Sequence, residues 1–288
     1  MPDIVLHPET AAAISRLIAS PPQSLMIIGP AGSGRSALAR HLAIRLLDTQ
    51  SPGDHPQYRV ISAADGIEAI RNLQHFASLK VPGADAAVNR IAVVEQAEQL
   101  GIEAQNAFLK LLEEPPKGTL LMLLTTHGSA LLPTIQSRVQ SLTVRAPQNE
   151  ALHRHFSDLG HDQKSIQQVT LMTGGLPGLA TALLDGDATH PLYAAAEQAR
   201  QLLRLSTFER LATVDSLAKQ KETAIQTVIM LCRMAAAALR QMAQVPTPEA
   251  GKRVATWQRI LTASDQAATQ LRQNGQPKLV LTELMLAL

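Results

Sequence analysis

The sequence predicts an α/β P-loop domain followed by a half that is almost entirely helical. Up to about residue 146, short apolar runs alternate with stretches of helical periodicity, as they do in parallel βαβ units. After residue 147 the strand-like runs stop, and apolar residues recur at helical spacing instead. These two patterns indicate a parallel sheet with flanking helices, then helical domains.

The elements can be placed in order from these patterns. A helix is expected at 8–18, and Pro21 and Pro22 follow its end. Later segments are assigned by apolar runs for strands and by 3.6-residue periodicity for helices. The expected strands are 25–28, 58–62, 91–94, 120–125 and 141–144, and the expected helices are 37–47, 65–79, 100–113, 150–159, 163–173 and 176–184. Residues 191–288 are expected to be mostly helix, with breaks at 245–248 and 274–277.

Composition limits the class of protein. Aromatic residues make up only 2% of the 288 residues, which predicts an aliphatic core and argues against an aromatic platform for stacking bases. The net charge of +2 is too small to indicate a nucleic-acid partner by itself. No run of about 18 apolar residues and no signal-peptide pattern is found, so neither a membrane span nor secretion is expected.

The chain has one cysteine, Cys232, which excludes an intrachain disulfide and fits a cytoplasmic protein. A small core residue on a helix is the simpler interpretation of this cysteine, and a reactive nucleophile is the alternative. His55 and His75 are the histidines considered as metal ligands, but without cysteines or acids at ligand spacing they predict surface residues and no metal site.

A phosphate-binding motif follows the strand at 25–28. Residues 29–36 read Gly-Pro-Ala-Gly-Ser-Gly-Arg-Ser, which matches the P-loop template at Gly29, Gly34 and Ser36, with a further glycine at Gly32. Glycines let backbone N–H groups converge on an anion, and the helix that follows adds its positive end. The template's lysine, which reaches the β- and γ-phosphates, is replaced by Arg35. The loop is therefore expected to form, with altered phosphate chemistry.

The apolar run at 91–94 ends in acidic residues, where a P-loop protein carries its Walker B motif. The first acid there holds Mg²⁺ and the second orients or deprotonates the attacking water. Glu95 occupies the first position, but Gln96 occupies the second, and an amide cannot act as a general base. The alternative is that acids at this point merely begin a helix, whose N-terminus favours negative charge.

Longer motifs resemble one family. Residues 104–116, Ala-Gln-Asn-Ala-Phe-Leu-Lys-Leu-Leu-Glu-Glu-Pro-Pro, are similar to a segment of AAA+ clamp-loader subunits. Residues 132–139 resemble that family's L-x-P-T-I-x-S-R-C motif, with Val139 in place of the cysteine. The strand at 120–125, with Thr126 after it, resembles the family's sensor-1 strand. Residues 274–284 resemble its closing collar helix. The resemblance is dense from 29 to 138 and thin from 147 to about 270.

This resemblance implies roles for particular residues. Arg138 corresponds to the family's arginine finger, which is donated in trans to the ATP of a neighbouring subunit. Gly29, Gly32, Gly34, Arg35, Ser36, Glu95, Gln96 and Thr125 correspond to the nucleotide site. The lid turn at 173–179 lacks the arginine that the family often offers to the phosphates, and the family's four-cysteine zinc module is absent. Arg35, Gln96 and the missing lid arginine are three departures at one nucleotide site. The resemblance implies that such losses are typical of the bacterial delta-prime branch of the family.

The implied organisation is an AAA+ domain at 1–146, a helical lid at 147–187 and an all-α collar domain at 188–288. The implied function is that of a delta-prime-like subunit of the DNA polymerase III clamp loader, without independent ATPase activity. Its expected partners are gamma/tau-like and delta-like subunits, with the sliding clamp and primer-template DNA reached through the complex. No cofactor is required, although weak ATP and Mg²⁺ binding stays possible. The alternative is an active AAA+ ATPase motor subunit, either gamma/tau-like or DNA-remodelling. In such a motor, Lys and a second acid would be expected in place of Arg35 and Gln96.

Overall fold

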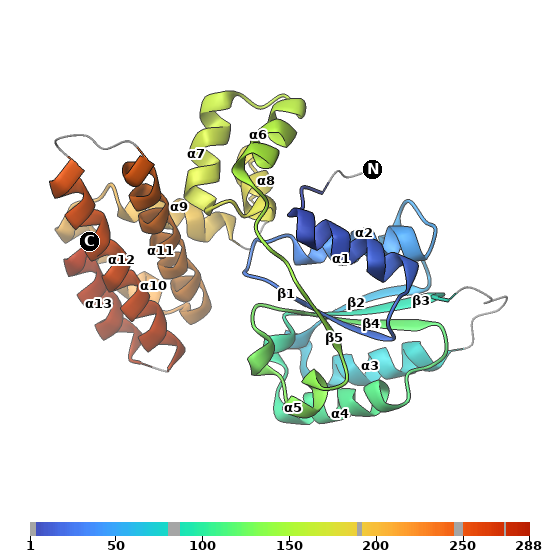
Figure 1. Ribbon diagram of the computed structural model, residues 1–288. Helices are drawn as coiled ribbons and strands as arrows, with labels where there is room; N and C mark the ends of the chain where they lie inside the picture. The colour runs from blue at the N-terminus through green and yellow to red at the C-terminus, as the bar shows by residue number, and fades with distance from the viewer. Residues whose placement is uncertain (1–3, 80–86, 189–191, 245–249, 274) are drawn as a thin grey trace. The chain divides into compact units, whose positions relative to one another are not determined.

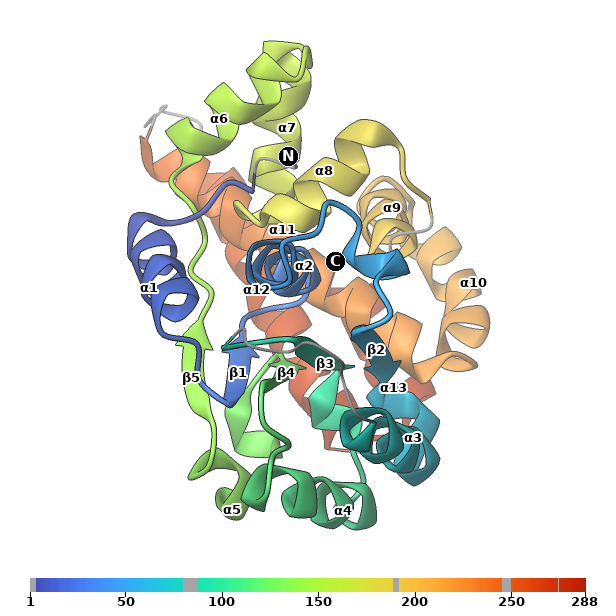
Figure 2. The same cartoon turned by 90° about the vertical axis from the view of Figure 1, so that its right-hand side faces the viewer.

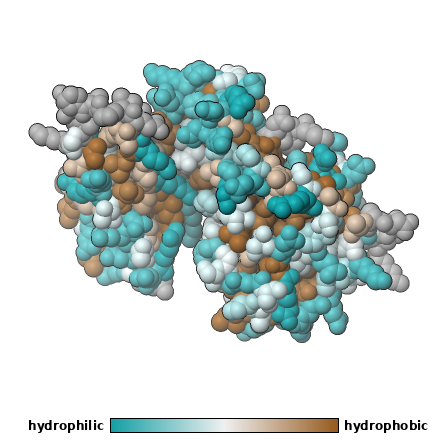
Figure 3. All heavy atoms as spheres, viewed as in Figure 1, coloured by the Kyte–Doolittle hydropathy of each residue, from teal (hydrophilic) through white to brown (hydrophobic). Residues whose placement is uncertain are grey.

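The structure is a computed structural model, and it describes residues 4–79, 87–188, 192–244, 250–273 and 275–288. The chain divides into two compact units, Met1–Pro147 and Gln148–Leu288. Figure 3 shows polar and apolar residues interspersed over one face of each unit. Large apolar side chains are exposed singly at several places, for example Ile102 and Phe208, as is usual for protein surfaces.

The N-terminal unit contains a five-stranded parallel sheet with the strand order β2-β3-β4-β1-β5 in the part of the chain that the structure describes. The strands are β1 (Ser24–Ile28), β2 (Tyr58–Ser62), β3 (Arg90–Glu95), β4 (Thr119–Thr125) and β5 (Gln140–Thr143), and the helices are α1 (Pro8–Ala19), α2 (Arg35–Leu46), α3 (Gly66–Ser78), α4 (Ile102–Glu113) and the short α5 (Pro133–Gln136). Single 3₁₀ turns lie at Pro52–Asp54, Ala63–Asp65, Ala97–Gln99 and Gly128–Ala130.

The sheet is covered by helices on both faces, as Figures 1 and 2 show. Alternate residues of each strand point to opposite faces, so each central strand contributes side chains to the hydrophobic cores on both faces of the sheet. Met26 and Leu121 pack with residues of α3 and α4, whereas Ile27 and Leu120 pack with residues of α1 and α2. This explains why β3 and β4 are continuous apolar runs, as strands buried on both faces are expected to be.

The C-terminal unit is helical throughout its described residues. Its helices are α6 (Asn149–Asp158), α7 (Gln163–Thr173), α8 (Pro177–Asp185), α9 (Tyr193–Leu202), α10 (Thr207–Ala218), α11 (Lys221–Gln244), α12 (Ala250–Arg272) and α13 (Pro277–Ala287). α10 begins with a capping box in which Ser206 and Glu209 satisfy each other's backbone N–H groups. The long helix α11 packs against α7, α9, α10 and α12 and forms the centre of this unit.

The elements expected from the sequence are confirmed to within a few residues. The expected helix at 37–47 begins two residues earlier, at Arg35, because Gly34 itself caps it. The expected strand at 141–144 lies at Gln140–Thr143. The sequence also predicts a loop at 81–89 and a linker at 186–191. Most of that loop, the end of that linker and the expected break at 245–248 lie outside the described residues. The division into lid and collar stays a prediction, since both lie in one compact unit.

Helix α11 bears on the expectation that no segment spans a membrane. Its stretch Lys221–Arg240 is long and apolar enough to cross one by length and composition alone, although charged residues interrupt the apolar run. The core helix of a helical bundle has the same character, and Val228, Met230 and Leu231 of α11 are buried against neighbouring helices. This single helix is therefore weak evidence for a membrane span.

Cys232 also lies on α11 and is partly buried. Burial, followed by the nearby Asp265 carboxylate, raises the pKa of its thiol to about 11. Because the thiolate is the reactive form, this environment favours the core-residue interpretation over the nucleophile.

Arg90 is a buried arginine that ties β3 to the end of α3. Its side chain donates to the carbonyls of Ala77 and Leu79, the latter at 2.5 Å, and to the Gln57 amide oxygen at 3.1 Å. The guanidinium also lies 5.1 Å from the centroid of the Phe76 ring. Only 3% of Arg90 is exposed, so its charge is satisfied by helix-end carbonyls and an aromatic face.

Replacing Arg90 with Met should therefore destabilise the N-terminal unit by at least about 2 kcal/mol, since carbonyls lose charged donors in a buried site. Arg59→Met is the matched control, because Arg59 also lies over the Phe76 ring, at 5.6 Å, but is exposed. It should cost less than about 1 kcal/mol. Hydrogen exchange of the α3 and β3 amides measures both effects, and equal losses of protection would contradict this account.

Candidate functional site

The candidate site forms where three neighbouring strands end. β1 lies next to β4, with Ile28 paired to Thr125, and β4 lies next to β3. The carboxyl ends of parallel strands meet at one edge of the sheet, which is where open α/β sheets bind ligands. The sequence-predicted residues Gly29, Glu95 and Thr125 follow or end these strands, so the fold brings them to the same edge.

The P-loop has the conformation that its glycines allow. Gly32 and Gly34 have φ angles of 82° and 88°, in the left-handed region that favours glycine. Gly34 is the N-cap of α2. The N–H of Gly29 donates to the Thr125 carbonyl at 3.1 Å, and a Cβ added to Gly29 would lie 2.7 Å from Ser33 Oγ. The loop is therefore closely packed against the end of β4 and against itself.

Arg35 turns its side chain back into this loop. Its Nη1 donates to the Gly29 carbonyl, with 2.6 Å between the two atoms. Burial lowers the pKa of Arg35, and the nearby carboxylates of Glu98 and then Glu95 oppose that shift. Arginine side chains stay protonated in proteins, so Arg35 holds a positive charge in the loop at the position of the template's lysine.

Ser36 and Glu95 contact each other directly. The Ser36 hydroxyl donates to Glu95 Oε1 at 2.5 Å. In P-loop ATPases the equivalent serine or threonine and the first Walker B acid together hold Mg²⁺. The structure brings these two residues of the predicted nucleotide site together, with one bonded to the other.

The other two predicted residues of the nucleotide site are arranged differently. Gln96 is exposed and has a φ of 53°, an uncommon conformation for a residue other than glycine. Thr125 is fully buried, and its hydroxyl donates to the His127 carbonyl at 3.0 Å. The Thr125 side chain therefore stabilises the turn after β4.

Sequence reasoning gave Glu98 no role in the site and named Thr126 only together with the sensor-1 strand. Glu98 accepts from the Thr126 hydroxyl at 2.9 Å and from the Thr126 N–H at 3.3 Å, while its charge acts on Arg35. Thr126 directly follows the predicted Thr125, and Glu98 lies two residues after the predicted Gln96, but only the turn at Gln96 brings Glu98 under the end of β4. An acid three residues beyond a Walker B strand is the signal that could have found it.

Arg138 lies in a different part of the same unit, directly after α5. Its Nη1 donates to the Thr134 carbonyl at 3.0 Å, and its Nη2 lies 3.3 Å from Glu113 Oε1 at the end of α4. The side chain is 40% exposed. Arg138 therefore contacts α4 and α5 and presents part of its guanidinium at the surface.

Among the described residues, no group of three or more His, Cys, Asp or Glu side chains is arranged to hold a metal ion. The Ser36–Glu95 pair is the place where a nucleotide-bound Mg²⁺ would be expected.

Comparison with known proteins finds relatives of the N-terminal unit. Residues 19–148 match the sequence model of the family described as DNA polymerase III, delta subunit. The chain is 33% identical to the DNA polymerase III subunit delta' of Pseudomonas aeruginosa over 181 residues, which covers 55% of this chain and 54% of that protein. Over these residues the chain is therefore similar to clamp-loader subunits, and in particular to the delta-prime subunits.

The chain is similar to other known proteins as well. The chain is 29% identical to subunit delta' of Escherichia coli, over 47% of this chain and 41% of that protein, and 30% identical to the replication factor C small subunit of Picrophilus torridus, over 49% and 43%. A solved DNA polymerase III gamma subunit-related protein of Thermotoga maritima is 19% identical, with 96% and 97% coverage and a TM-score of 0.47. The chain spans about half the length of the curated relatives that it matches.

Replacing Gly34 with Ala tests the conformation of the P-loop. A side chain at a φ of 88° should destabilise the unit by about 1–2 kcal/mol. Gly53→Ala is the control, since a Cβ at Gly53 would meet nothing within 4 Å, and it should change stability by less than about 0.5 kcal/mol. Protection of the β1 and β4 amides from hydrogen exchange measures the change in stability of both variants. If Gly34→Ala leaves stability unchanged, the loop can relax to accept a side chain at this position.

Proposed function

We propose that this chain is a delta-prime-like clamp-loader subunit, which assembles with ATPase subunits and supports loading of a sliding clamp onto primed DNA. The family model that matches residues 19–148 and the relatives named subunit delta' and replication factor C small subunit support this role. The observation that carries it is Arg138, a partly exposed guanidinium presented at the surface between α4 and α5.

The proposal assigns Arg138 to the ATP of a neighbouring subunit. Phosphoryl transfer spreads negative charge over the γ-phosphate oxygens, and a planar guanidinium offers paired donors to them. A residue with this task must reach the surface of its own subunit and be held in a limited set of orientations. The Thr134 carbonyl and the Glu113 carboxylate supply such restraints while 40% of the side chain stays exposed.

The proposal also assigns no hydrolysis to this chain's own site. The Arg35 guanidinium is bonded to the Gly29 carbonyl, whereas a lysine in this position would extend toward the phosphates. Gln96 cannot take a proton from water. The chain therefore requires no cofactor for its role, and any ATP and Mg²⁺ binding would be weak.

Gamma/tau-like and delta-like subunits are the proposed partners, and the clamp and primer-template DNA are reached through the assembly. The all-α C-terminal unit is the proposed collar. An active motor subunit is the second candidate, and the contact between Ser36 and Glu95 favours it, because it keeps the two Mg²⁺-holding side chains adjacent. The ATPase assay below separates the two functions.

The isolated chain should release phosphate from ATP no faster than buffer. Arg35→Lys should increase binding of a fluorescent ATP analogue with Mg²⁺, because lysine frees the loop and can extend to the phosphates, but should leave hydrolysis at background while Gln96 is present. Gln96→Glu alone should increase neither binding of the ATP analogue nor ATP hydrolysis. Wild-type turnover that Arg35→Ala or Gly34→Ala abolishes would establish the motor function instead.

Arg138→Ala should lower the DNA-stimulated ATPase of the reconstituted assembly while leaving assembly itself intact. Arginines supplied in trans contribute about 10³–10⁵ in rate to GTPases, so turnover at the adjacent site should fall by at least about tenfold. Arg138→Lys should also be impaired, because an ammonium lacks the guanidinium's fork.

Arg145→Ala is the matched control, because Arg145 is another exposed arginine of the same unit, paired with Glu9 at 2.8 Å. It should assemble and support parental ATPase rates. Parental rates for both Arg138 variants within intact complexes would show that the chain has a purely structural role.

A further inference from the structure

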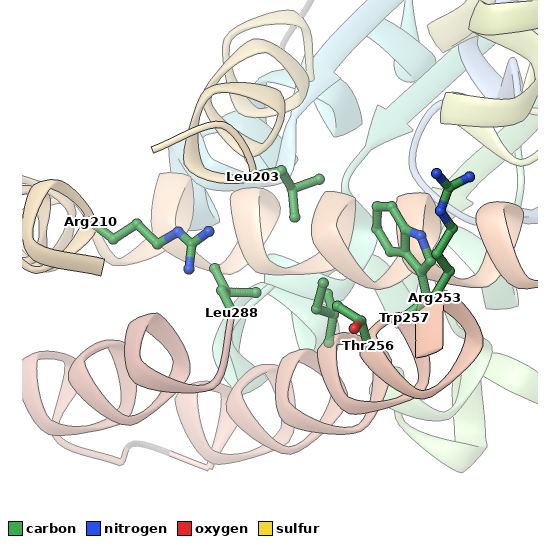
Figure 4. Close-up of a pocket in the computed structure, with 7 residues that line it drawn as sticks. Leu203, Arg210, Arg253, Thr256, Trp257 and Leu288 are labelled. Atoms are coloured by element: carbon green, nitrogen blue, oxygen red, sulfur yellow. The ribbon is translucent and has the colours of Figure 1, made fainter. Parts of the chain in front are cut away.

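A pocket of about 390 Å³ lies in the C-terminal unit, where four helices meet. α12 supplies most of its wall, through Arg253, Thr256, Trp257 and Ile260, and the other lining residues are Leu203 after α9, Arg210 of α10 and Leu288 after α13. Its volume falls within the range of about 300–1,000 Å³ that is usual for ligand pockets. Figure 4 shows Trp257 and Arg253 side by side, with Leu203 and Arg210 reaching in from other helices.

The pocket combines an apolar floor with two cations. Ile260 is buried, whereas Trp257 and Leu203 are partly exposed to the opening. Arg210 and Arg253 carry the only charged side chains in the lining, and neither is in an ion pair with a carboxylate among the described residues. Arg210 is held in place through its Nε, which donates to the Leu202 carbonyl at 2.8 Å. Its two terminal nitrogens lie beyond that anchor.

This arrangement selects a particular chemistry. Guanidinium groups recognise carboxylates through paired hydrogen bonds, and an indole ring contributes a large apolar contact area. Tryptophan and arginine are also the residues that most often dominate protein–protein binding energy. The adjoining Leu203, Ile260 and Leu288 side chains are aliphatic, so they suit an apolar side chain better than a stack of bases, for which further aromatic residues would be needed.

We propose that this pocket binds an acidic peptide segment of another protein that carries a large apolar side chain beside its carboxylates. The apolar side chain lies on Trp257 and Ile260, and the carboxylates meet Arg210 and Arg253. The proposal concerns the C-terminal unit alone and does not depend on the role of Arg138.

Trp257 is the only tryptophan in the chain, so its emission reports occupancy of the pocket directly. The probe is the synthetic peptide acetyl-Asp-Asp-Asp-Gly-Phe-Leu with a free terminal carboxylate, titrated to about 1 mM into the full-length protein. Saturable change in the emission is expected, weakening with added salt. A peptide with Asn in place of Asp and an amidated terminus, and a peptide with Ser in place of Phe and Leu, should each bind at least about tenfold more weakly.

Arg253→Gln and Thr256→Glu should each lower the affinity for the peptide at least about tenfold. The first removes a charged hydrogen-bond donor, and the second places a negative charge in the pocket. Both residues are exposed, so neither change should disturb folding, which circular dichroism checks. Arg259→Gln is the matched control, because it removes an exposed positive charge from the same helix outside the pocket lining. Its affinity should stay within about twofold of the parent.

Three results would overturn the proposal. One is the absence of any saturable change in Trp257 emission. Another is an equal loss in Arg253→Gln and Arg259→Gln, which would mean non-specific attraction to positive charge. The third is tighter binding of oligo(dT) or of decanoate than of the peptide, because the pocket would then serve a nucleic acid or a small amphiphile.

Discussion

The parallel pairing of β3, β4 and β1 is the constraint on which the candidate site depends. These strands carry the P-loop, the Glu95 carboxylate and the turn after Thr125, and only their shared register places the three at one edge. β3 and β4 are almost wholly buried between two layers of helices. Each buried aliphatic side chain contributes about 1.5–3 kcal/mol, so the sheet is a rigid support for a loop rich in glycine. The loop's conformation therefore follows from packing that lies outside it.

Much of this fold could be predicted from the sequence because its strands are strongly apolar and its P-loop is a local motif. The position of Glu98 could not, because it depends on a left-handed backbone at Gln96, and nothing in the residue type requires that conformation. The contact between Arg138 and Glu113 joins positions 25 residues apart and depends on how α4 and α5 pack. The C-terminal pocket was equally hidden, since its lining residues come from four helices and carry no motif. Local patterns identified the components of the sites, and tertiary packing decided which of them meet.

An arginine in place of the template's lysine would change the proposed nucleotide site through bonding as well as through shape. Both side chains carry a positive charge, but the guanidinium has enough donors to satisfy the Gly29 carbonyl from within the loop. A phosphate would have to displace that bond, and a hydrogen bond from a charged donor contributes about 1.5–3 kcal/mol. Losing it would lower nucleotide affinity by roughly tenfold to a hundredfold. A single substitution can therefore weaken binding while leaving the loop's backbone in its usual form.

The contacts that hold Arg138 contribute little free energy, and this bears on its proposed role. An exposed ion pair such as Arg138–Glu113 contributes at most about 1 kcal/mol, and the bond to the Thr134 carbonyl contributes about as much again. A trans arginine that accelerates hydrolysis by about 10³–10⁵ contributes about 4–7 kcal/mol to the transition state. The contacts within the subunit are thus strong enough to orient the guanidinium and too weak to withhold it from a neighbour's γ-phosphate. If the Arg138 side chain were buried as Arg90 is, its contacts within the chain would hold the guanidinium too strongly for it to reach a phosphate outside.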